Sequence, residues 1–78
     1  MENTNLFSRE EMECANAKFI LKEVSEILKE RGYNPINQIV GYLLSGDPGY
    51  VTSYKDAREK ITSLDRADLM ACLLKGYL

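Results

Sequence analysis

G-Y-N-P-I-N-Q-I-V-G-Y-L-L-S-G-D, residues 32–47, is the stretch that decides the fold of this chain. It carries no charge from Gly32 to Gly46, although 28% of all residues are charged. Asn34 is a good N-cap, and Pro35 suits the first helical position, where no N–H is needed. Glycines at both ends suit the left-handed conformation that ends a helix. The helix between them carries an apolar stripe of Ile36, Ile39, Val40, Leu43 and Leu44.

The opposite face of this helix is small, neutral and hydrogen-bonding rather than charged. It holds Asn37, Gln38, Gly41 and Ser45, with Tyr42 at its edge. A glycine inside a helix costs about 1 kcal/mol relative to alanine, but it lets another backbone approach closely. Two interpretations follow: a central helix covered on both sides by its own chain, or a surface for self-association or a partner. A chain of 78 residues has little material to cover both faces, which favours the second.

The remaining sequence predicts an all-α fold with helices near residues 9–31, 35–45, 54–63 and 66–76. Capping boxes are expected at Ser8–Glu11, Ser53–Asp56 and Asp65–Asp68. The order Asp47-Pro48-Gly49 is typical of a type II turn. No stretch alternates with period two, so no strand is predicted. Residues 1–7 are expected to form a mobile tail, and residues 8–78 a single helical domain.

The first predicted helix does not carry one continuous apolar face. Met12, Ala15 and Phe19 point one way, whereas the apolar residues of the second half point roughly 120° away at 100° per residue. Either the helix bends near residues 16–18, or its first half packs against something that the second half does not contact.

Composition excludes several classes of protein. The net charge is −2 and no segment is strongly basic, so we expect neither nucleic-acid binding nor attraction to an anionic membrane. No apolar run approaches the roughly 18 residues of a membrane span, and the polar N-terminus is not a signal peptide. Cys14 and Cys72 lack C-x-x-C spacing, which argues against a zinc knuckle or a redox dithiol. We therefore expect a cytoplasmic protein with both cysteines reduced.

No constellation of residues looks catalytic, and no cofactor is expected. The chain has no histidine, the commonest general base and metal ligand. Asp56, Glu59 and Asp65 follow no calcium-loop pattern, so pairing on helix surfaces explains them better than a metal site. The alternative function is DNA binding by a helix-turn-helix, in which the later helix would present Lys55, Arg58 and Lys60. The acidic residues beside those cations argue against it.

The block from Gly32 to Pro48 resembles the IreB family of small regulatory phosphoproteins from Gram-positive bacteria. The resemblance continues through residues 54–58 and Ile61, and ends with Tyr77 and Leu78. It is weaker in the N-terminal third. Ala71 and Cys72 stand where the family tends to be acidic, and Gly49 stands where alanine is usual.

The resemblance implies a small helical homodimer that is not an enzyme. It further implies a cytosolic substrate of a membrane-bound Ser/Thr kinase and its partner phosphatase, acting as a negative regulator in cell-envelope stress and cephalosporin tolerance. Family phosphorylation falls on tail threonines in a T-x-x-F context, which only Thr4 fits here. We expect the dimer or partner interface at Asn37, Gln38, Gly41, Tyr42 and Ser45, with Met12 and Phe19 as a second candidate surface.

Overall fold

The structure, a computed structural model, describes residues 9–78. The elements are α1 (Arg9–Glu30), α2 (Pro35–Ser45), the 3₁₀ turns η1 (Pro48–Tyr50) and η2 (Tyr54–Asp56), α3 (Ala57–Thr62) and α4 (Arg66–Tyr77). Within that range there is no strand, so the predicted all-α fold is confirmed. The expected tail at residues 1–7 and the cap at Ser8 lie outside the described residues.

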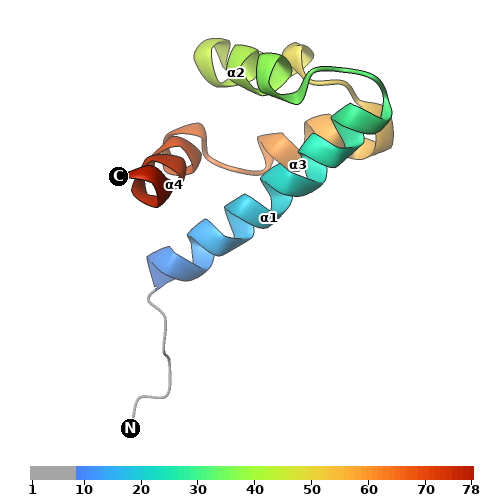
Figure 1. Ribbon diagram of the computed structural model, residues 1–78. Coiled ribbons are helices and arrows are strands. Elements are labelled where there is room, and N and C mark those ends of the chain that lie inside the picture. Colours follow the sequence, from blue (N-terminus) through green and yellow to red (C-terminus); the bar gives the residue numbers. More distant parts are fainter. Residues whose placement is uncertain (1–8) are drawn as a thin grey trace, which may run out of the picture.

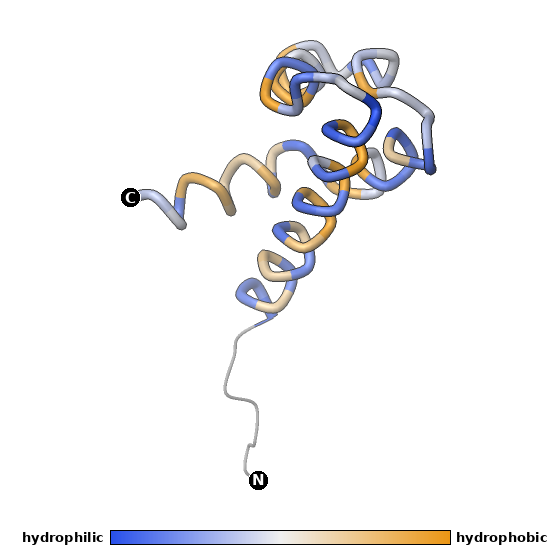
Figure 2. The backbone as a smooth tube through the Cα atoms, turned by 45° about the vertical axis from the view of Figure 1, so that its right-hand side comes forward, coloured by the Kyte–Doolittle hydropathy of each residue, from blue (hydrophilic) through white to orange (hydrophobic). Residues whose placement is uncertain are grey.

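Helix α1 is the axis on which the other helices are arranged (Figure 1). It contacts α2, α3 and α4, each of which is shorter. Helix α2 lies across the C-terminal end of α1, and α4 lies beside its N-terminal half. Each turn of α1 carries both apolar and polar residues, as Figure 2 shows. This amphipathic pattern is what allows one long helix to bury successive partners along one side.

The hydrophobic core lies where the second half of α1 meets α3 and the loop before it. Val24 and Leu28 of α1 are fully buried there against Val51, Ala57 and Ile61, each with 0% exposure. Tyr42 of α2 joins the same cluster. The core therefore depends mainly on α1, α3 and Val51, and Tyr42 is the one buried side chain that α2 adds to it.

The two halves of α1 pack on different elements without a break in the helix. The second alternative drawn from the sequence holds only in part: the first half faces α4, but through Cys14 and the buried Ala17 rather than through Met12, Ala15 and Phe19, which are all exposed. Met12 and Phe19 remain on the outside, 58% and 69% exposed. The misaligned apolar residues therefore include two that the described chain does not cover.

Several predicted helix signals are confirmed. The Asn34 side chain accepts a hydrogen bond from the Asn37 N–H, and Asp65 accepts one from the Asp68 N–H, each at 3.0 Å. Gly46 ends α2 with φ +75°. These signals act over three or four residues, so the sequence alone is enough to find them.

The predictions for the loop after α2 are wrong in two places. Gly49 does not adopt the positive φ that a type II turn requires. The loop instead forms a 3₁₀ turn, in which the Gly49 N–H donates a hydrogen bond to the Asp47 side chain. The Ser53 side chain makes no capping hydrogen bond, because Lys55 and Asp56 take left-handed conformations and α3 begins only at Ala57.

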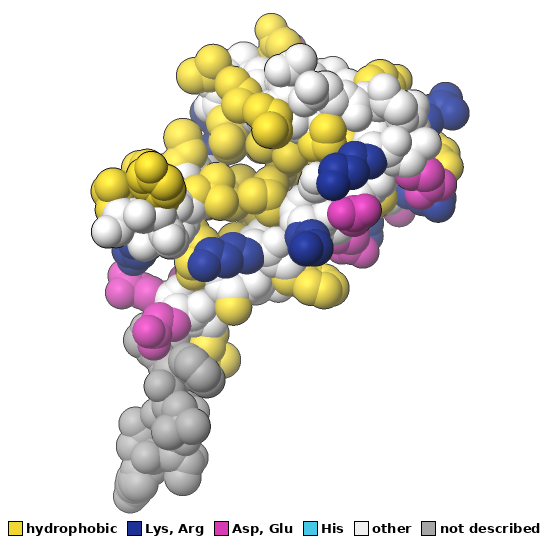
Figure 3. Space-filling view, viewed as in Figure 1, with side chains coloured by type: hydrophobic (Ala, Val, Ile, Leu, Met, Phe, Trp, Pro, Cys, Tyr) yellow, Lys and Arg dark blue, Asp and Glu magenta, His cyan; other side chains and the backbone are white. Residues whose placement is uncertain are grey.

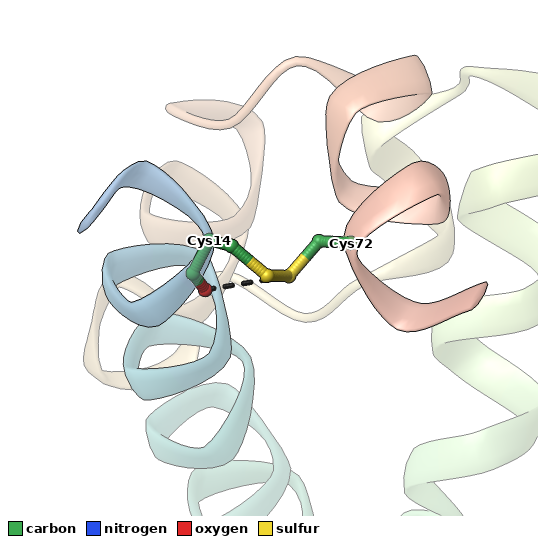
Figure 4. The surroundings of a disulfide bond; sticks show 2 residues. All are labelled: Cys14 and Cys72. Carbon is green, nitrogen blue, oxygen red and sulfur yellow. Dashed lines mark hydrogen bonds between the residues drawn. A yellow bond between two sulfur atoms is a disulfide. The ribbon is translucent and has the colours of Figure 1, made fainter. Parts of the chain in front are cut away.

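The prediction that both cysteines are reduced is also wrong for this structure, because Cys14 and Cys72 form a disulfide between α1 and α4 (Figure 4). Their Cα atoms are 5.5 Å apart, within the usual range for a disulfide. The two residues are separated by 58 positions, so no local spacing motif could reveal the pair.

Gly41, inside α2, leaves space for the aromatic ring of Tyr50 in the same chain. A Cβ atom at Gly41 would lie 2.5 Å from Cδ1 and 3.0 Å from Cε1 of Tyr50. Such distances are below van der Waals contact, so any side chain would displace the ring. The close approach that the sequence suggested for a partner backbone is thus made by Tyr50 in η1.

This packing predicts that the effect of Gly41→Ala depends on Tyr50. In the wild-type background the added methyl group displaces the ring, which offsets the roughly 1 kcal/mol that alanine gains from helix propensity. In a Tyr50→Ala background only the propensity remains, so Gly41→Ala should stabilise the chain by about 1 kcal/mol. Urea unfolding of the wild type, the two single variants and the double variant measures the free energy of unfolding of each, and hence the effect of Gly41→Ala in both backgrounds. Equal effects of Gly41→Ala in both backgrounds would contradict the packing.

Candidate interaction surface

One edge of α2 exposes apolar side chains to solvent. Ile36, Val40 and Leu44 are 72%, 45% and 82% exposed. They follow one another at intervals of four residues, so they form a continuous row along the helix. Ile39 and Leu43, which belong to the same predicted stripe, turn inward and pack against the core. The stripe is therefore divided: part of it supports the fold, and the rest has no cover within residues 9–78.

A groove runs between this edge, α1 and α4. It encloses about 460 Å³ and is open to solvent. Its apolar lining comes from three helices and consists of Leu21, Pro35, Ile36, Ile39, Val40, Leu43 and Leu73. Figure 3 shows apolar side chains over α2 and α4 on this side of the molecule, and Lys or Arg side chains along α1. The α1 rim carries Lys18, Lys22, Lys29 and Glu26. The groove thus combines apolar walls with a mainly basic rim.

The neutral face of α2 is partly covered by its own chain. Tyr42 is only 5% exposed, so its expected place in a partner interface is not supported by its position. Gly41 lies under Tyr50, and Gln38 has a buried Oε1 atom without a hydrogen-bond partner. Ser45 is exposed, and its hydroxyl donates to the Gly41 carbonyl oxygen at 2.8 Å. Asn37 is exposed too and borders the apolar row.

The other predicted site residues fall in two places. Neither Met12 nor Phe19 lines the groove: Met12 borders a separate hollow between α1 and α4, and Phe19 is 69% exposed on α1. The phosphorylation candidate Thr4 lies outside the described residues.

The three cations proposed for DNA recognition are all held by the chain itself. Lys55 Nζ lies 2.8 Å from a Glu30 carboxylate oxygen, and Lys60 Nζ lies 3.5 Å from one of Glu23. Arg58 Nε donates to the Val51 carbonyl oxygen at 2.8 Å. A helix whose basic side chains are turned back to its own protein is poorly arranged to read a nucleic acid.

The contact between α1 and η2 is also the clearest electrostatic feature. Hydrogen bonds from Lys55, and then from the Tyr54 hydroxyl at 2.9 Å, lower the pKa of Glu30. The same ion pair raises the pKa of Lys55. On α3, a hydrogen bond with Asp56 raises the pKa of Glu59. Among residues 9–78, no group of acidic or cysteine side chains is arranged to hold a metal ion.

The lowered pKa of Glu30 predicts the sign of an acid effect. Its contribution to stability should be present above the ordinary value of 4.5 and should be lost as pH falls through the lowered pKa. Glu30→Gln should therefore lower the melting temperature at neutral pH, with a difference that shrinks in acid. Thermal melts from pH 2 to pH 7 measure it, and Glu10→Gln controls for loss of a negative charge. A constant difference across this range would refute the assignment.

Comparison with known sequences places the chain among small bacterial proteins. The family described as IreB regulatory phosphoprotein matches residues 2–78. A UPF0297 protein of Ruminiclostridium cellulolyticum is 49% identical over 78 residues, covering all of this chain and 89% of the relative. A UPF0297 protein of Acetivibrio thermocellus is 48% identical over 75 residues, covering 96% of this chain and 83% of the relative. The match begins at residue 2, so the likeness extends further into the N-terminal third than the motifs alone indicate.

Among the helices of residues 9–78, none has both the length and the apolar character that crossing a bilayer requires.

Proposed function

The chain belongs to the IreB family of regulatory phosphoproteins, and on this premise we propose that it is a non-enzymatic cytoplasmic regulator controlled by phosphorylation of Thr4. A Ser/Thr kinase would add the phosphate and a partner phosphatase would remove it. The protein would act as a negative regulator in cell-envelope stress and cephalosporin tolerance. The family match over nearly the whole chain is the observation that carries this proposal.

The positions of the other threonines support Thr4 as the acceptor. Thr62 is in α3, where its hydroxyl donates to the Arg58 carbonyl oxygen at 2.9 Å. Thr52 Oγ1 accepts a hydrogen bond from the Tyr54 N–H in the loop that leads to η2. A kinase binds its acceptor segment in an extended form, so both residues would have to leave hydrogen-bonded structure first. Thr4 precedes α1 and carries the T-x-x-F context.

Phosphorylation of the full chain by a bacterial Ser/Thr kinase tests the acceptor. We expect one added phosphate, which Thr4→Ala abolishes and the matched Thr62→Ala retains, as measured by intact mass and peptide mapping. A phosphate that persists in Thr4→Ala would place the acceptor elsewhere. A kinase known to modify a related protein should be used, so that an inactive enzyme is not mistaken for a wrong site.

We further propose that the protein forms a homodimer through α2, with the contact centred on the exposed apolar row of Ile36, Val40 and Leu44. An exposed row of this kind on a small chain is typical of an association surface. Because a two-fold axis brings a surface patch against itself, an uncharged row is suitable for the centre of the contact. Asn37 and Ser45 would lie at the border. Within the neutral face that the sequence predicts at the interface, Gly41 and the neighbouring Tyr42 are less accessible because Tyr50 and the core cover them.

Two glutamate substitutions on α2 distinguish these surfaces. Leu44→Glu places a charge in the apolar row at a position that is 82% exposed, so the protomer should still fold. We expect it to sediment as a monomer, whereas Asn37→Glu at the border should weaken association less. Sedimentation equilibrium and circular dichroism report mass and fold. If only Asn37→Glu dissociates the dimer, the neutral face is the interface; if wild type is monomeric, the dimer proposal is wrong.

A further inference from the structure

Cys72, which forms the disulfide between α1 and α4, is the last buried residue of the chain. Cys72 is 4% exposed, and every residue from Leu73 to Leu78 is exposed. The N-terminal half of α4 has other attachments: Leu69 is 1% exposed, and Arg66 Nη1 donates to the Leu43 carbonyl oxygen at 2.9 Å. In the C-terminal half, Cys72 provides the covalent attachment of α4 to α1.

From this arrangement we propose that Cys14 and Cys72 form a reversible redox site, whose oxidation fixes the C-terminal half of α4 against α1 and whose reduction releases it. The substrate class is low-molecular-weight thiols and their disulfides. A disulfide in the reducing compartment that the proposed function requires is usually redox-sensing rather than permanent. The chemistry itself depends only on the two cysteines, so it can fail or hold independently of Thr4 and of the dimer.

A small thiol can reach the bond. A hollow of about 670 Å³ opens between the N-terminal half of α1 and α4, and both cysteines line it. Cys14 is half-buried whereas Cys72 is buried, so the Cys14 sulfur is the accessible target. A thiolate attacks Cys14 Sγ and expels the Cys72 thiolate, leaving a mixed disulfide on Cys14. A second thiolate attacks the sulfur of the bound small molecule and frees Cys14. Two small thiols are oxidised to one disulfide, and the two cysteine thiolates take up two protons.

The reduced form already has a place for one of those protons. Cys72 Sγ lies 3.4 Å from the backbone carbonyl oxygen of Cys14, as the dashed line in Figure 4 marks. The oxidised sulfur has no hydrogen to donate, but the Cys72 thiol formed by reduction can donate to this oxygen. A weak thiol hydrogen bond then takes the place of a covalent bond, so reduction loosens the attachment of α4 to α1 without leaving the new thiol unpartnered.

Release of α4 would alter the apolar groove. Leu73, which directly follows Cys72, is the residue that α4 contributes to the groove lining. With the bond closed, Leu73 is held opposite α2. With the bond open, the helix keeps its buried attachments at Leu69 and Arg66 but loses its covalent one, so we expect the wall to move away more easily. The oxidation state would thus control the shape of the groove.

The charge around the hollow predicts a preference among thiols. Its lining contains four carboxylates, of Glu10, Glu13, Asp65 and Asp68, and two cations, of Arg9 and Lys75. An anionic thiol such as glutathione should be repelled, and a cationic thiol such as cysteamine should be attracted. The preference should fall as salt screens the charges.

The first experiment equilibrates the full chain in buffers of reduced and oxidised glutathione, followed by alkylation and intact mass. We expect two monomeric forms, with both cysteines alkylated or neither, that interconvert without denaturant. Hydrogen exchange then compares them. On reduction, the amides of residues 73–77 should exchange at least about fivefold faster, while those of α3 should not change. Cys14→Ser should exchange like reduced wild type in either buffer.

Three results would overturn the proposal: reduction only after unfolding, disulfides mainly between chains, or equal acceleration of exchange in α3 and α4. The last would mean that the bond stabilises the whole domain rather than one helix.

The second experiment compares the rates at which cysteamine and glutathione reduce the disulfide. At low salt, cysteamine should reduce the bond several-fold faster than glutathione. Asp68→Asn should narrow that difference, and an unchanged ratio would refute the electrostatic part of the argument.

Discussion

The packing of α1 against α3 and Val51 is the interaction on which the rest of the structure depends. It buries Val24, Leu28 and Ile61 completely, and these residues form the centre of the core. Helix α2 therefore rests on the edge of this core through Tyr42, Ile39 and Leu43. Within residues 9–78 no element covers its outer row of Ile36, Val40 and Leu44, and a chain of 78 residues has little material with which to cover both faces of a helix.

Local signals made most of the fold predictable. The caps at Asn34 and Asp65 and the helix end at Gly46 act over a few residues, and each was placed correctly. The prediction of a cap at Ser53 was wrong because contacts with residues far away in the sequence compete with it. Tyr54 and Lys55 both bind Glu30, 24 and 25 positions earlier, and the Arg58 N–H bonds to the Thr52 carbonyl oxygen. These contacts determine the path of the backbone before α3, and no local pattern reveals them.

The interface residues predicted on α2 differ in how far the chain itself covers them. A glycine inside a helix indicates a close approach without saying which group approaches, and here the Tyr50 ring fills the space. The apolar stripe likewise could not show which of its members would be covered, because that depends on how α2 crosses the end of α1. The Cys14–Cys72 pair was missed for a similar reason, since only the tertiary fold brings the two helices together.

The central claim is that the uncovered row on α2 is an association surface and not merely exposed to solvent. Photochemical carbene labelling of the native protein across a dilution series, read by mass spectrometry, tests it most directly. The account predicts that labelling of Ile36, Val40 and Leu44 falls as protein concentration rises, while labelling of the exposed Tyr77 stays constant. Equal labelling of the row across a concentration range in which sedimentation shows the mass rising from monomer to dimer would contradict it.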